Sequence, residues 1–109
     1  MIYVFKGIVE YYKEKGLYEE YIEEIEYVTT RFFLGNSYLR ACRINDTNIR
    51  KETLEKGWKY LNEAFPSFKD NKYLELPGKK NRYFKNISEK KYFSNVKVFR
   101  LLYKLNIIK

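Results

Sequence analysis

The sequence contains no histidine and only one cysteine, Cys42. These absences exclude a catalytic triad built on histidine, a zinc site built on histidine or several cysteines, and an internal disulfide. The single cysteine agrees with a reducing compartment. It falls on the apolar face of a predicted helix, and we interpret it as a core residue rather than a nucleophile.

Long hydrophobic runs are also absent. The longest uninterrupted hydrophobic stretch has five residues, Met1 to Phe5, whereas a helix that crosses a bilayer needs about 20. The N-terminus has no basic segment followed by an apolar core, so we expect no secretory signal. These features predict a cytoplasmic chain.

What the sequence does contain is enough apolar surface for a core. Of its 109 residues, 45% are hydrophobic, and they include 12 Tyr and 8 Phe. This length fits a single domain over residues 1–109.

Charge is unevenly distributed along the chain, whose net charge is +8. Residues 1–64 carry 10 basic and 11 acidic side chains, whereas residues 65–109 carry 12 basic and 3 acidic ones. This asymmetry suggests that the C-terminal part meets phosphate groups, although a solvated basic surface without a partner has the same pattern.

Hydrophobic spacing of three and four residues predicts an all-α fold, a small bundle of about four helices. The expected helices cover 2–15, 17–43, 49–64 and 88–105, with an irregular basic segment near 66–88. Gly35-Asn36-Ser37 interrupts the second helix and indicates a kink or the close approach of another helix. We assign Tyr18, Tyr21, Phe32, Trp58 and Phe65 to the core.

Catalytic motifs are missing from the sequence. The acidic pairs at 19–20 and 23–24 lie on a polar helix face, where adjacent side chains diverge by about 100°. There is no Asp-x-Asp pair, no Gly-x-x-x-x-Gly-Lys loop and no Gly-x-Gly-x-x-Gly fingerprint.

Two stretches resemble the C-terminal region of bacterial family 2 glycosyltransferases, which build capsule and exopolysaccharide. They are Tyr11 to Tyr21 followed by Glu24-Ile25-Glu26-Tyr27, and Trp58 to Pro66 followed by Phe68-Lys69 and Asn71 to Leu74. A basic aromatic helix over 92–108 comes after them. The resemblance implies an inactive accessory C-terminal domain that supports a catalytic domain in cis. The divalent metal and the nucleotide sugar would belong to that absent domain, so no catalytic, metal or cofactor residue is assigned here.

The resemblance further implies a peripheral position at the inner face of the cell membrane. Candidate contacts are the basic stripe of the last helix and neighbouring aromatic rings: Lys90, Lys97, Arg100, Lys104, Tyr92, Phe93 and Phe99. Each basic side chain near an anionic leaflet adds about 1 kcal/mol. The rings that lie among Lys and Arg fit this membrane role or the edge of the core, and stacking on nucleotides is a third, less favoured role. These rings are Tyr73, Tyr83, Phe84, Tyr92 and Phe93.

Two other classes of function stay open. A helical module for a protein partner or a second copy of the chain would pair its acidic and basic helices with complementary surfaces. A small nucleic-acid binder is the third alternative, although no helix-turn-helix, zinc-finger or ribonucleoprotein motif accompanies the charge.

Overall fold

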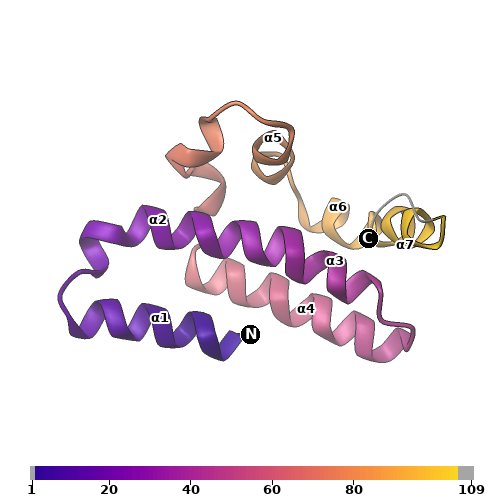
Figure 1. Ribbon diagram of the computed structural model, residues 1–109, viewed down its shortest axis with the longest axis horizontal. Helices are drawn as coiled ribbons and strands as arrows, with labels where there is room; N and C mark the ends of the chain where they lie inside the picture. Colours follow the sequence, from indigo (N-terminus) through magenta and orange to yellow (C-terminus); the bar gives the residue numbers. More distant parts are fainter. Residues whose placement is uncertain (1, 106–109) are drawn as a thin grey trace.

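A long helical rod forms the centre of the fold (Figure 1). The computed structural model describes residues 2–105, and the rod comprises α2 (Tyr18–Arg31), the π-helical turn η1 (Phe32–Asn36) and α3 (Ser37–Cys42). Helices α1 (Ile2–Glu14) and α4 (Thr47–Ala64) lie along one side of the rod. Within the described range there is no strand, which confirms the predicted all-α class.

The interruption predicted at 35–37 is a π-helical turn. The Ser37 N–H bonds back to the Phe32 carbonyl, a five-residue step that widens the helix without ending it. Phe84 lies across this turn, with its Cζ atom 3.7 Å from the position that a β-carbon on Gly35 would occupy. Helix α5 (Lys79–Lys85), which carries Phe84, therefore approaches the rod closely at Gly35.

Local signals explain the ends of the first helices. Gly16 has φ +69°, a left-handed conformation suited to glycine, and it turns the chain from α1 back along α2. The Asp46 carboxylate accepts a 3.0 Å hydrogen bond from the Ile49 N–H and caps α4. Helix α4 ends at Ala64, two residues before Pro66.

The segment predicted as irregular contains more helix than expected. Two 3₁₀ turns, η2 (Phe68–Asp70) and η3 (Lys72–Glu75), pass along α2, and a seven-residue helix α5 (Lys79–Lys85) follows. The Tyr27 hydroxyl of α2 donates a 2.9 Å hydrogen bond to the Asn81 side chain of α5. This segment covers the side of the rod opposite α1 and α4 (Figure 1).

The prediction of one C-terminal helix over 88–105 is wrong, because the chain divides into α6 (Glu89–Ser94) and α7 (Val96–Lys104). The predicted start at Ser88 is confirmed, since its hydroxyl caps the Lys91 N–H. Tyr92 of α6 and Phe99 of α7 both pack on Tyr38, with ring centroids 4.8 and 5.5 Å away.

Aromatic rings dominate the core where α3, α4 and α6 meet. Tyr38 donates a 2.6 Å hydrogen bond to the Tyr92 carbonyl, and the Tyr92 hydroxyl donates to the Leu54 carbonyl at 3.1 Å. Among the five predicted core residues, Phe65 is buried, whereas Tyr18, Phe32 and Trp58 are half-buried and pack against the core. Tyr21 is 40% exposed, so its assignment to the core is wrong.

Candidate functional site

The seven residues predicted to form a binding surface do not share one face of the molecule. Three lysines are exposed, two phenylalanines and one arginine are half-buried, and one tyrosine is in the core. In that order they are Lys90, Lys97, Lys104, Phe93, Phe99, Arg100 and Tyr92. The structure therefore divides the predicted stripe into parts with different roles.

Tyr92 is a core residue, which corrects its expected place among the ring anchors. Its side chain is 2% exposed, and its ring lies 4.8 Å from the rings of both Tyr38 and Trp58. Burial also raises the pKa of its hydroxyl well above the ordinary value for tyrosine. A membrane cannot reach this ring while the protein is folded.

Phe93 and Phe99 occupy the edge of the same core. The Phe93 ring meets Tyr92 edge to face at 4.9 Å, and Phe99 meets Tyr38 edge to face at 5.5 Å. Both side chains are only partly exposed. Both rings pack mainly against the protein. Only the outer part of each ring is left to contact a membrane or a partner.

Arg100 turns toward the end of α3 instead of the solvent. Its Nη1 atom donates hydrogen bonds of 2.8 Å to the Cys42 carbonyl and 3.0 Å to the Ile44 carbonyl. The last carbonyls of a helix carry partial negative charge and have no partner within the helix. Arg100 supplies that partner for Cys42, shares the Ile44 carbonyl with Arg50, and fastens α7 to the end of α3.

An exposed apolar row on α7 was missed by the sequence interpretation. Val98, Leu101 and Leu105 are 53%, 56% and 59% exposed. They follow a spacing of three and four residues and therefore lie on one face of the helix. Lys97 and Lys104 are their direct neighbours in sequence and are also exposed. We call these five residues the α7 face.

The signal for this row was present in the sequence. The rings at 92, 99 and 103 face the protein: Tyr103, although 43% exposed, lies against the Arg43 guanidinium at 5.1 Å. A second apolar row on the opposite face of a surface helix is not needed for packing. That surplus could have been detected by counting apolar residues on both faces.

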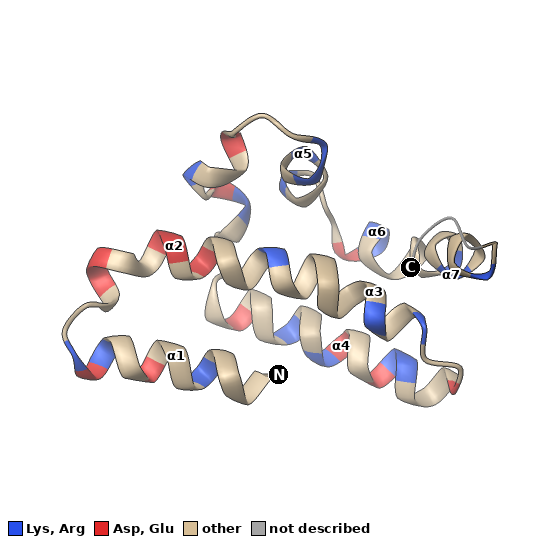
Figure 2. Ribbon diagram, viewed as in Figure 1, with Lys and Arg blue, Asp and Glu red and all other residues tan. Residues whose placement is uncertain are grey.

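Basic side chains gather on the C-terminal helices. Figure 2 shows Lys and Arg on α5, α6 and α7, whereas Asp and Glu concentrate on the first half of α2. Exposed lysines at the start of α5 and along α6 are Lys79, Lys80, Lys90 and Lys91. The predicted charge asymmetry of the sequence is thus also an asymmetry of the surface.

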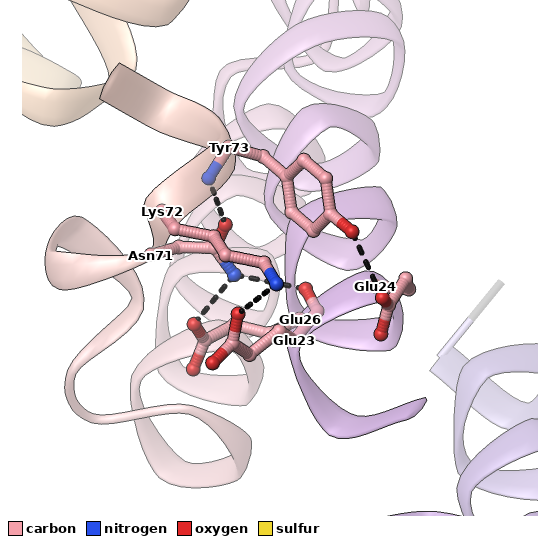
Figure 3. Close-up of polar contacts among 6 residues, drawn as sticks. All are labelled: Glu23, Glu24, Glu26, Asn71, Lys72 and Tyr73. Carbon is pink, nitrogen blue, oxygen red and sulfur yellow. Dashed lines mark hydrogen bonds and ion pairs between the residues drawn. The ribbon is translucent and has the colours of Figure 1, made fainter. Parts of the chain in front are cut away.

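The acidic side chains of α2 bind the segment that crosses it (Figure 3). The Asn71 amide donates to the Glu26 carboxylate at 2.8 Å and to the Glu23 carbonyl at 2.9 Å. Lys72 lies 3.2 Å from the Glu23 carboxylate, and the Tyr73 hydroxyl donates to Glu24 at 2.8 Å. These contacts hold residues 71–73 against α2.

Two of these carboxyl groups have shifted pKa values. Partial burial raises the pKa of Glu26 above its usual range, and the neighbouring charges of Glu23 and Asp70 add to that effect. The hydrogen bond from Tyr73 lowers the pKa of Glu24. Contacts within the protein therefore account for both pKa shifts.

Cys42 is buried, as predicted, at 2% exposure. Burial raises the pKa of its thiol to about 11, so the thiolate needed for nucleophilic attack is scarce at neutral pH. Within residues 2–105, no three His, Cys, Asp or Glu side chains lie close enough to hold a metal ion.

An apolar groove lies beside the π-helical turn, between the central rod and α5. Its volume is about 520 Å³. Leu34, Tyr38 and Phe84 are its buried lining residues. The less buried lining residues are Val28, Arg31, Phe32, Gly35, Asn36, Leu39, Lys79, Lys80, Tyr83 and Phe99.

None of the described helices is long and apolar enough to pass through a bilayer. No protein-family model, no curated protein and no solved structure matches the chain. The α7 face and the groove beside the π-helical turn are therefore interpreted from their own geometry and chemistry.

Proposed function

We propose that this chain is a non-catalytic accessory domain that docks on an anionic membrane surface through the α7 face. The resemblance to family 2 glycosyltransferases implies that this domain supports a catalytic domain in the same polypeptide. That catalytic domain would belong to an enzyme of cell-surface polysaccharide synthesis, and docking would hold it at the membrane. The observation that carries the docking proposal is the exposed row Val98, Leu101 and Leu105, with Lys97 and Lys104 beside it.

Helices with this pattern lie in the plane of a membrane interface. Apolar side chains enter the boundary between headgroups and acyl chains, and lysines beside them reach the headgroup phosphates. The remaining side of α7 is fastened to the protein by Arg100 and Phe99, so the helix presents one fixed face. Exposed Lys90 and Lys91 on α6 extend the positive surface toward the same end of the chain.

Vesicle sedimentation tests the docking proposal. The chain should sediment with vesicles rich in phosphatidylglycerol at low salt, and it should be released as the salt concentration rises. Lys97→Gln with Lys104→Gln should weaken binding about thirtyfold, because each lysine near an anionic surface contributes about 1 kcal/mol. Val98→Ser with Leu101→Ser should also weaken binding, since it removes the inserted apolar groups.

The matched control is Lys6→Gln with Lys51→Gln, which removes the same charge from exposed positions on α1 and α4. This variant should bind almost as well as the original chain. Equal binding to neutral phosphatidylcholine vesicles would contradict the proposal. Salt-insensitive self-association through Val98 and Leu101, without vesicle binding, would instead support a protein-binding module.

The glycosyltransferase part of the proposal has a separate test. The reading frame upstream of Met1 should continue into a strand-rich segment that contains an Asp-x-Asp motif. A stop codon directly upstream would contradict that part and leave membrane docking as an independent question.

A further inference from the structure

We propose that the groove beside the π-helical turn binds a single-chain amphiphile with an anionic head, of the fatty-acid type. This site is separate from the α7 face and requires no membrane. It is defined by the groove of about 520 Å³ between the central rod and α5. That volume falls within the range of about 300–1,000 Å³ typical of small-molecule sites.

The groove offers an apolar surface to the chain of such a ligand. Its buried lining residues, Leu34, Tyr38 and Phe84, are held in place by the core. Val28 lines the groove while it is 57% exposed, so its apolar surface remains open to solvent. Covering this surface with a hydrocarbon chain is favourable in proportion to the apolar area removed from water.

Positive charge lines the groove without acidic neutralisation. Arg31, Lys79 and Lys80 are lining residues, and the lining includes no Asp or Glu. None of these three cations takes part in the ion pairs formed among residues 2–105. Arg31 lies over the Tyr27 ring at 5.6 Å, which keeps its guanidinium close to the helix. A carboxylate head would therefore be attracted to this groove.

Two other hollows show that this combination is specific to the groove. A smaller hollow of about 240 Å³ is apolar, but its lining contains Glu24 and no cation. Another, of about 420 Å³, contains Lys79, Arg82 and Lys91 but only Tyr83 and Ile87 as large apolar lining residues. Only the groove at the π-helical turn, among these three, joins several cations to an extended apolar lining.

The π-helical turn sets how closely α5 approaches the rod beside the groove. Gly35 lies in this turn and faces Phe84 without a side chain of its own. Its backbone is not left-handed, so a larger residue is compatible with the local conformation. A leucine at this position would meet the Phe84 ring, which also lines the groove, and would change the space that we assign to the acyl chain.

Nuclear magnetic resonance titration with monomeric laurate tests the proposal. Laurate should produce saturable one-to-one shifts in the amides of 34–39 and 83–84. Dodecanol, which has the same chain length without the charge, and acetate, which has the charge without the chain, should both bind more weakly. Lys79→Gln with Lys80→Gln should weaken laurate binding about fourfold, since each partly screened charge contributes a factor of about two.

Two further variants complete the experiment. Gly35→Leu, shown to be folded by circular dichroism, should abolish the saturable shifts. Lys97→Gln with Lys104→Gln removes equal charge from the α7 face and should leave laurate binding unchanged, which separates this proposal from membrane docking. The absence of saturable shifts in residues 34–39 would overturn the proposal. So would a laurate affinity of the Lys79/Lys80 double variant equal to that of the original chain. Stronger binding of acetate than laurate would identify a simple anion site and would also overturn it.

Discussion

Glu26 is an acid of α2 whose partial burial disfavours its charged form. Its carboxylate accepts the Asn71 amide at 2.8 Å, yet burial and the charges of Glu23 and Asp70 raise its pKa. A glutamine would keep an acceptor oxygen for Asn71 and would remove the partly buried charge. The substitution Glu26→Gln therefore measures the effect of the charge while the hydrogen bond to Asn71 is kept.

Glu26→Gln should raise the midpoint of thermal unfolding at pH 7. An acid whose pKa is higher in the folded state binds more protons there than in the unfolded state, so the wild-type chain gains stability as the pH falls through that pKa. The advantage of the variant, up to about 1 kcal/mol for a partly exposed charge, should therefore shrink in acid. Thermal melts from pH 7 to pH 4 measure this, and a constant difference over that range would contradict it.

Tyr92 shows what residue type alone does not reveal. A tyrosine flanked by lysines fits a membrane interface and also fits the edge of a core. Its place in the core depends on contacts with residues far away in the sequence. One of them is the Leu54 carbonyl, 38 residues away, which accepts a hydrogen bond from the Tyr92 hydroxyl. The prediction for Cys42 is confirmed because its helical position already marked it as apolar.

At the scale of elements, periodicity predicted the helices that pack along their full length. The first three predicted ranges agree with α1, the central rod and α4 to within about two residues at each end. The break at Asn95 could not be predicted in this way, because the helical spacing continues through it: Tyr92, Val96, Phe99 and Tyr103 follow at steps of three or four residues. The α7 face, by contrast, was predictable, because Val98, Leu101 and Leu105 form a second apolar row opposite the rings at 92, 99 and 103.

Arg100 provides the test at this scale, because it joins α7 to the end of α3. Arg100→Gln should lower the free energy of unfolding by about 1.5 kcal/mol, since it removes hydrogen bonds from a charged donor to two carbonyls. Chemical denaturation measures the loss. The variant should keep most of its binding to anionic vesicles, because Val98, Leu101, Lys97 and Lys104 remain in place.

Arg40→Gln is the matched control for Arg100, since Arg40 is an exposed arginine on α3. It should leave the free energy of unfolding almost unchanged. If Arg100→Gln instead abolished vesicle binding and left stability intact, Arg100 would act at the surface, as the sequence pattern suggested. The two measurements thus separate a fastening role from a docking role.

At the scale of the whole molecule, the excess of positive charge lies within a small volume, so its like charges are close to one another. The net charge is +8, and the molecule measures 46 × 31 × 23 Å. The Debye length is about 30 Å at 0.01 M salt and about 10 Å at 0.1 M. At the lower salt concentration, charges repel one another across the full width of the bundle, which destabilises the folded state.

Sodium chloride between 0.01 and 0.1 M should therefore raise the midpoint of thermal unfolding. Replacing Lys79, Lys80, Lys90 and Lys91 by glutamine should raise the midpoint at low salt and reduce its response to added salt, because fewer like charges remain to be screened. These four lysines are exposed and form none of the ion pairs found within residues 2–105, so their replacement removes repulsion without removing a contact of that kind. A midpoint that falls with salt would mean that attraction between the acidic α2 and the basic segment that crosses it outweighs the repulsion.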